Sequence, residues 1–188
     1  MTGVSQAARQ RLFTAVDPPP AVREDLAAWA KAQSGGARGV RLIAPANIHL
    51  TMAFLGERPA SEMPAIIEAI SRTAQFCRGE LALQVAAPIL LPPRSPRVLA
   101  AGVVDRNGAL TRLHEELTSA LVEQIDYRER RAFRPHLTLA RLARDAELPA
   151  ELSPLRADEF SCGELILYRS HLEPSGARYE EAERVALN

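Results

Sequence analysis

A seven-residue segment occurs twice in this chain, and the repeat restricts both the fold and the chemistry that the chain can have. The first copy, from His49 to Leu55, reads HLTMAFL; the second, from His136 to Leu142, reads HLTLARL and begins 87 positions later. Besides His-Leu-Thr, the copies share an alanine and a leucine at matching offsets. Four of the 188 residues are histidine, so the same local sequence around two of them indicates one shared site.

Each copy begins by alternating polar and apolar residues, which predicts a half-buried β-strand. Because successive side chains of a strand point to opposite faces, the histidine and threonine of each copy share a face, about 6 to 7 Å apart. Continued alternation places Phe54 and Arg141, each five positions after its histidine, on the opposite face, unless the strand bulges before them.

The rest of the sequence predicts helices and strands in an order that suggests two similar halves. Apolar stripes predict helices over Asp17–Gln33, Ser61–Cys77 and Asn107–Ile125. Further strands are expected over Arg11–Val16, Glu80–Ala87, Arg97–Val104, Gly163–Leu172 and Ala177–Leu187. We expect an α+β fold in which residues 1–188 form one bilobal domain with two pseudo-symmetric lobes. Each lobe would have a mostly antiparallel sheet and flanking helices, with the two His-Thr pairs facing each other across a cleft.

Composition argues against membrane insertion and against a general attraction to nucleic acid. Lys+Arg and Asp+Glu both number 23, so any preference for a charged partner must be local. The first 16 residues lack an apolar stretch of signal-peptide length, and no run of about 18 apolar residues occurs. The two cysteines, Cys77 and Cys162, do not suggest a disulfide framework. We therefore expect a cytoplasmic monomer with reduced cysteines and no membrane partner.

Two imidazoles on opposite sides of one phosphoryl group suit an in-line displacement at phosphorus. One ring takes a proton from the attacking water, and the other gives a proton to the leaving oxygen. An ordinary histidine pKa of about 6.5 lets one ring be neutral and the other protonated near neutral pH. Threonine hydroxyls and an arginine can then hold the non-bridging oxygens, where charge builds up.

Two other interpretations of the histidines stay open beside this one. A single strand histidine is more often a satisfied polar residue than a catalyst, although the repeat favours function. A metal site would need further ligands, and neither copy contains Asp or Glu, so we expect no metal and no cofactor. His114, beside a leucine stripe, is expected at the surface. His171 has no partner threonine and is expected to have a structural role.

The two motifs, HLTM at His49–Met52 and HLTL at His136–Leu139, resemble the paired His-x-Thr-x signature of the two-histidine (2H) phosphoesterase superfamily. The flanking segments RLFTAV, PANIHLTMAFLGE, FRPHLTLAR and LYRSHLEPSGARYE are similar to the bacterial and archaeal RNA 2′,3′-cyclic phosphodiesterase branch, also called 2′-5′ RNA ligase. The likeness covers almost the whole chain.

This resemblance implies an active site between the two lobes and a metal-independent opening of terminal 2′,3′-cyclic phosphates that leaves a 2′-phosphate. It makes His49 the general acid for the departing 3′ oxygen and His136 the base that activates water. The substrate-binding residues that it implies are Thr51, Thr138 and Arg141 for the phosphate and Phe54 for the terminal base. The chain departs from the family at Ala100, where a tryptophan is common, and at Leu42, where an aromatic residue is frequent.

A local basic segment around the second histidine fits an RNA end. It contains Arg128, Arg130, Arg131, Arg134, Arg141 and Arg144. These residues can meet phosphates upstream of the cyclic terminus, but a solvated arginine-rich loop explains them as well.

Three functional hypotheses follow. The first is a phosphodiesterase acting on RNA 2′,3′-cyclic ends. The second is a related enzyme that uses the same site on small cyclic nucleotides or on 2′-5′ linkages, including the reverse ligation. The third is a non-catalytic module that binds RNA ends, which the paired histidines disfavour, because Arg or Lys would serve phosphate capture better.

Overall fold

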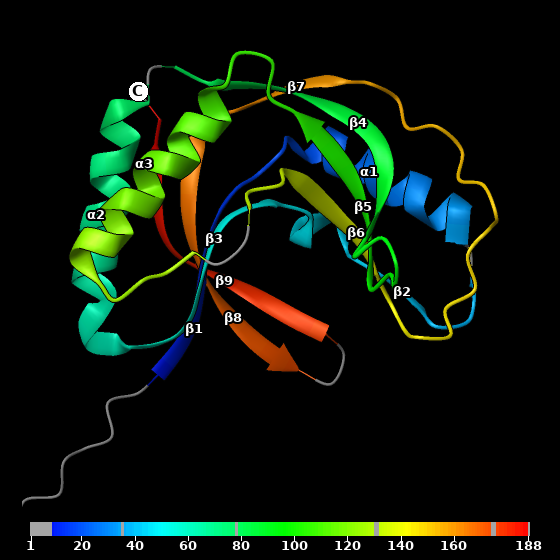
Figure 1. The fold of residues 1–188 in the computed structure, drawn as a ribbon, viewed down its shortest axis with the longest axis horizontal. Coiled ribbons are helices and arrows are strands. Elements are labelled where there is room, and N and C mark those ends of the chain that lie inside the picture. The colour runs from blue at the N-terminus through cyan, green and yellow to red at the C-terminus, as the bar shows by residue number, and fades with distance from the viewer. Residues whose placement is uncertain (1–8, 35, 78, 130–131, 174–175, 188) are drawn as a thin grey trace, which may run out of the picture.

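A single nine-stranded sheet runs through the protein, and three helices pack on it (Figure 1). The computed structural model describes residues 9–34, 36–77, 79–129, 132–173 and 176–187. The strands are β1 (Arg9–Val16), β2 (Val40–Leu42), β3 (Leu50–Pro59), β4 (Leu81–Leu91), β5 (Val98–Val104), β6 (His136–Leu142), β7 (Glu159–Cys162), β8 (Glu164–Glu173) and β9 (Gly176–Ala186). The helices are α1 (Pro20–Ser34), α2 (Met63–Phe76) and α3 (Ala109–Gln124), with short 3₁₀ turns η1 (Pro45–Asn47) and η2 (Ala60–Glu62).

The strand order is β7-β4-β5-β6-β3-β1-β8-β9, and β2 pairs with β6 beside β3. Each pairing is antiparallel. Strands β3 and β6 share one register pair, Leu50 with Leu137. We call this place the seam. It divides the sheet into a first half, made of β1, β3, β8 and β9, and a second half, made of β2 and β4 to β7. Each half therefore contains one copy of the repeat.

The helices cover one face of the sheet and leave the other face to the histidines. Helices α2 and α3 pack against each other (Figure 1). Helix α2 contacts β8 and β9, α3 contacts β3 and also β4 of the second half, and α1 lies along β2 and β6. The three helices predicted from apolar stripes are confirmed, with ends that differ from prediction by at most three residues. Among the described residues, no helix has the length and apolar character needed to cross a membrane.

The core lies between the helices and the covered face. Its largest fully buried side chains are Leu12, Ile48, Leu50, Ile66, Ile70, Leu81, Leu99, Leu110, Leu117, Leu121, Leu137 and Leu139. Leu50 and Leu137 of the seam belong to this set, and truncating such a leucine to alanine typically costs about 2 to 5 kcal/mol. The two sheet halves are thus joined at the seam mainly through buried apolar side chains.

The prediction that His114 lies at the surface is wrong. Its side chain is 8% exposed, and its ring stacks on Phe133 with the centroids 3.9 Å apart and the planes 11° from parallel. The leucine stripe of α3 is wide enough to include this edge position, and the loop before β6 covers it. Burial lowers the pKa of His114, which favours the neutral ring in this place. Cys77, the residue directly after α2, is partly buried.

Candidate active site

The two copies of the repeat meet side by side at the seam. Because β3 and β6 are antiparallel and Leu50 pairs with Leu137, continuing the register sets His49 across from Thr138 and Thr51 across from His136. The two leucines point into the core, so the four polar side chains share the other face. A local twofold relation between the copies therefore passes through the pair of leucines, and each histidine lies opposite the threonine of the other copy.

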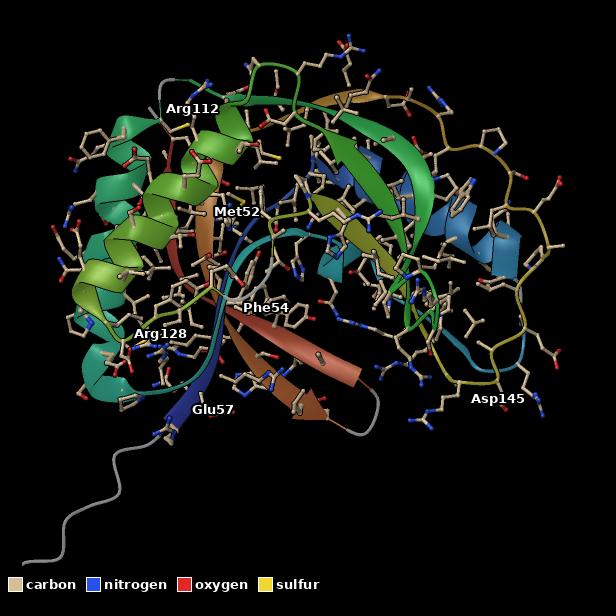
Figure 2. All side chains as sticks on the ribbon, viewed as in Figure 1. Met52, Phe54, Glu57, Arg112, Arg128 and Asp145 are labelled. Atoms are coloured by element: carbon tan, nitrogen blue, oxygen red, sulfur yellow. The ribbon has the colours of Figure 1, made fainter. Side chains whose placement is uncertain are left out.

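The first copy contains a β-bulge directly after its threonine. Along β1, Ala15 pairs with Thr51 and the next residue, Thr14, pairs with Ala53, so Met52 has no partner of its own. Both Met52 and Ala53 are buried, at 2% exposure each. Such an extra residue shifts the alternation of side chains by one position. Phe54 consequently lies on the face of Thr51, and it is 62% exposed. Figure 2 shows Met52 on the side of β3 toward the helices and Phe54 on the other side.

The second copy bulges at the same offset. Along β5, Ala100 pairs with Thr138 and Leu99 pairs with Ala140, so Leu139 is the extra residue. Leu139 and Ala140 are both buried, and the following Arg141 is exposed. Simple alternation, which places Phe54 and Arg141 away from the histidines, does not hold here, because both strands have the bulge that was named as its exception. The bulges bring them back to the histidine face.

Each histidine ring is held by a backbone carbonyl two positions before it. The distance from Nδ1 to the carbonyl oxygen is 2.9 Å from His49 to Asn47 and 2.7 Å from His136 to Arg134. Because a carbonyl oxygen only accepts, Nδ1 carries the proton and donates it in each bond. This arrangement fixes the tautomer and leaves Nε2 as the ring nitrogen that can exchange a proton with a ligand.

Aromatic rings surround His49. Phe13 of β1 stacks on it with the ring centroids 4.8 Å apart, and Tyr179 of β9 meets it edge-on at 5.2 Å. Burial is the main reason that the pKa of His49 falls from its ordinary 6.5 to about 4. The positive charges of Arg141 and His136 act in the same direction, and the hydrogen bond to the carbonyl opposes them. His49 is therefore neutral near pH 7 in the ligand-free protein.

Small residues of β5 lie beside His136. Its cross-strand partner on β5 is Gly102, and the partner of Thr138 is Ala100, so no large neighbour on β5 covers this part of the face. The Cβ that Gly102 lacks would lie 3.3 Å from the carbonyl oxygen of Ala87, which is tighter than most contacts. Arg141 lies farther along β6.

Three residues of the site were missed by reasoning from sequence alone. Phe13 and Tyr179 come from strands at opposite ends of the chain, and only the strand order brings them to His49. Asn47 supplies the carbonyl for His49, and its side-chain amide donates to the carbonyl of Ala177 in β9 at 3.3 Å. One feature of the sequence could have indicated Asn47. It lies two residues before its histidine, as Arg134 does in the second copy.

The remaining histidine, His171, has a structural partner. Nε2 of His171 in β8 forms a hydrogen bond with the carboxylate of Glu180 in β9 at 3.0 Å. Within the described ranges, no group of three or more His, Cys, Asp or Glu side chains is placed to hold a metal ion. The side chains on the histidine face offer two ring nitrogens that can exchange protons, and two hydroxyls and one guanidinium that can donate hydrogen bonds to an anion.

Comparison with known proteins relates most of the chain to one family. The family model of the 2′-5′ RNA ligase superfamily matches residues 18–173. Among curated proteins, the chain is similar to RNA 2′,3′-cyclic phosphodiesterases of Escherichia coli (32% identical, covering 95% of this chain and 97% of that protein) and Thermus thermophilus (33% identical, covering 94% and 90%). The enzyme of that name from Archaeoglobus fulgidus is 31% identical, with 91% and 97% covered.

Solved structures show the same relation. A Thermus thermophilus protein superposes with a TM-score of 0.83 at 30% identity, covering 94% of this chain and 97% of that one. Escherichia coli LigT complexed with 3′-AMP superposes with a TM-score of 0.80 at 30% identity, covering 96% and 99%. The likeness extends over nearly the full length in sequence and in fold, so this chain belongs to the 2′-5′ RNA ligase superfamily of 2H phosphoesterases and has their α+β fold.

Proposed function

We propose that this protein opens the 2′,3′-cyclic phosphate at the end of an RNA strand and leaves a 2′-phosphate. The observation that carries the proposal is the antiparallel meeting of the two repeats, which sets each histidine across from the threonine of the other copy. The relatives named RNA 2′,3′-cyclic phosphodiesterase support the same reaction for this chain.

In the proposed mechanism, His136 is the base and His49 is the acid. Nε2 of His136 takes a proton from water as the water oxygen attacks phosphorus. The bond from phosphorus to the 3′ oxygen breaks, and Nε2 of His49 gives its proton to that oxygen. The products are a 2′-phosphate and a 3′-hydroxyl. The donors to the non-bridging oxygens are Thr51, Thr138 and Arg141, and Phe54 contacts the terminal base.

The low pKa of His49 places a condition on this assignment. In the ligand-free protein the ring is neutral at pH 7, since its pKa is about 4. A phosphodiester anion at the site stabilises the protonated ring and also offsets the positive charge of Arg141, and both effects raise the pKa. We therefore propose that the substrate itself brings about the protonation of the acid.

The residues of the site supply an acid, a base and positive charge, so we propose a reaction that needs neither a metal nor another cofactor. We also propose that residues 1–188 act as one domain and as a monomer, because both histidines, both threonines and Arg141 come from one chain. Free cysteines are typical of reducing compartments, which supports a cytoplasmic location. Light scattering after gel filtration measures the oligomeric state, and a dimer would contradict that part of the proposal.

A second candidate uses the same site on small cyclic nucleotides or on 2′-5′ linkages, including ligation. The structure of LigT complexed with 3′-AMP favours it, because that neighbour accepts a mononucleotide. The third hypothesis, a module that only binds RNA ends, fits less well with two ring nitrogens whose tautomers are fixed for proton exchange.

Product analysis on a short oligonucleotide with a 2′,3′-cyclic end tests the proposal directly. With excess EDTA present, purified protein should convert the cyclic end to a 2′-phosphate, and the variant that lacks both histidines should not. A 3′-phosphate product would overturn the assignment of the leaving oxygen. Activity that EDTA abolishes and a divalent ion restores would overturn the metal-free mechanism.

A further inference from the structure

Two arginines lie directly opposite each other beside the site. In the pairing of β2 with β6, Arg41 is the register partner of Arg141. Directly paired residues of antiparallel strands project from the same face, with their Cβ atoms about 4.5 to 5.5 Å apart. Because the bulge at Leu139 returns Arg141 to the histidine face, Arg41 lies on that face too. Arg41 has no part in the proposed mechanism.

This pair of like charges has no acidic partner within the described part of the chain. Two other arginines of the sheet have acidic partners: Arg169 pairs with Glu180 at 2.9 Å, and Arg178 pairs with Glu173 at 3.0 Å. No such ion pair or side-chain hydrogen bond is found for Arg41 or Arg141 among the described residues. Like charges directly across a pair of strands destabilise a sheet. A bound anion would remove that repulsion.

The guanidinium of Arg41 lies against the first half of the sheet, although β2 belongs to the second. A Cβ built on Gly176, the first residue of β9, would be 3.3 Å from Nη1 of Arg41. The next residue, Ala177, accepts the hydrogen bond from the side chain of Asn47. Arg41 therefore reaches across the seam toward the strand that also supplies Tyr179.

The bulge also sets the distance along β6 between Thr138 and the backbone position of Arg141. Thr138 and Arg141 pair with Ala100 and Val98, which are two residues apart on β5. Arg141 thus begins about 6 to 7 Å beyond Thr138 along the strand. One nucleotide of an extended strand separates successive phosphates by a comparable length, so a phosphate next to the cyclic end would lie within reach of the arginine pair.

We infer that Arg41 binds the phosphodiester joining the terminal nucleotide to its 5′ neighbour, and that it makes the site specific for polynucleotide ends. The inference rests on the proposed function and deepens it. A planar guanidinium can hold two oxygens of that phosphodiester, and Arg141 beside it shares the added negative charge. A 2′,3′-cyclic mononucleotide has no such phosphodiester and cannot use Arg41.

The kinetic test compares two substrates with the same reacting group. One is a dinucleotide with a 2′,3′-cyclic end, and the other is the 2′,3′-cyclic monophosphate of its terminal nucleoside. Arg41→Met keeps the apolar stem and removes the charge, so kcat/KM on the dinucleotide should fall about 10- to 100-fold, the scale of a charged hydrogen bond. On the mononucleotide the change should stay within about twofold, the scale of a screened exposed charge.

Two further variants serve as controls. Arg72→Met removes an exposed arginine of α2 that pairs with Glu123 on the helical side, and it should behave like the wild type on both substrates. Arg41→Lys should recover part of the activity on the dinucleotide, because the charge returns without the planar fork. An equal loss on both substrates in Arg41→Met would overturn the inference, and so would an absence of loss on the dinucleotide.

A binding measurement keeps this test separate from the chemistry. The affinity for a labelled oligoribonucleotide ending in a 2′-phosphate is measured by fluorescence anisotropy at several salt concentrations. Each phosphate contact on a single strand contributes about 0.7 to the slope of log K against log salt. Arg41→Met should lower the slope by about that amount, and an unchanged slope would overturn the inference. If the wild type binds but does not open the cyclic end, the proposed function fails while the inference on binding is still decided.

Discussion

The two copies of the repeat share their geometry and differ in their surroundings. Both histidines donate Nδ1–H to the carbonyl two positions before, and both strands bulge after the threonine. Around His49, however, lie Phe13 and Tyr179, whereas β6 carries Arg141 with Arg41 opposite it. The local sequence therefore sets where the polar groups point, and the neighbouring strands set what those groups can bind.

The difference is concentrated at the residue five positions after each histidine. Phe54 pairs with Phe13 across β3 and β1, and Arg141 pairs with Arg41 across β6 and β2. An aromatic pair stabilises two strands by about 0.2 to 1 kcal/mol, whereas a pair of like charges destabilises them. The aromatic pair beside the first copy is thus stable without a ligand. A bound anion would reduce the charge repulsion between the two arginines beside the second copy. This contrast suits a nucleobase on one side and phosphate on the other.

The largest expected effect tests what the two copies have in common. His49→Ala and His136→Ala should each lower kcat by at least about 10² to 10⁴-fold, and the double variant should be little worse, because acid and base act as a unit. A substrate whose leaving group needs no proton should largely rescue His49→Ala and not His136→Ala, measured by initial rates. Rescue of His136→Ala instead would mean that the roles of acid and base are reversed.

The second prediction concerns phosphate binding by Arg141. Arg141→Ala should lower kcat by about 10 to 10³-fold, the scale of one donor to the developing charge, and the alanine variants of Thr51 and Thr138 should lie in the same range. In Arg141→Lys, kcat should fall more than KM rises, because a point charge replaces a planar fork. Steady-state kinetics that match the wild type would show that the bulge does not bring this side chain to the substrate.

Substitution of Phe54 should affect KM, whereas substitution of Arg141 should affect kcat, if the contrast between the two copies is correct. Phe54→Ala removes a surface for stacking the terminal base, so KM should rise about 5- to 50-fold while kcat changes little. Phe54→Leu serves as a control that keeps apolar volume without the ring. The effect should also vary with the terminal base of the substrate. A loss confined to kcat would place Phe54 with the phosphate ligands and would remove the proposed division between the copies.

The smallest effect on rate should be a change in pH dependence. Phe13→Leu lets water reach His49, so the pKa of that ring should rise from about 4 toward its ordinary 6.5. In the pH profile of kcat/KM, which reports groups of the free enzyme, the limb that His49 controls should then move to higher pH by about one unit. Phe160→Leu, a change to a buried ring of β7, is the matched control. A profile in which neither limb moves would mean that His49 does not control the pH dependence.

Sequence reasoning succeeded where the structure depends on local pattern. The leucine stripe of α3 follows from a helical periodicity within the segment itself. The shared face of His49 and Thr51 follows in the same way from strand alternation. The bulges at Met52 and Leu139 could not be read in this way, because a bulge exists only relative to the partner strand, here β1 or β5. The pairing of Arg41 with Arg141 was likewise hidden, since β2 has only three residues and little alternation.

The burial of His114 shows a related limit. Its position on the edge of the α3 stripe is compatible with solvent, and the loop carrying Phe133 decides the outcome by stacking on it. What the sequence could supply was the identity of the groups; what it could not supply was the strand register that assembles them.

The position of the seam in the chain has a consequence for synthesis on the ribosome. β3 pairs with β1 early in the chain, yet the first half is completed only by β8 and β9, which end at Ala186. A nascent chain that ends at Ser153 would contain both histidines but neither Tyr179 nor the strand that accepts the amide of Asn47. Contacts between such distant segments close loops late and slow folding. Enzymatic activity should therefore appear only after β8 and β9 have left the ribosome, which makes it a sensitive test of whether these two strands have paired with the rest of the sheet.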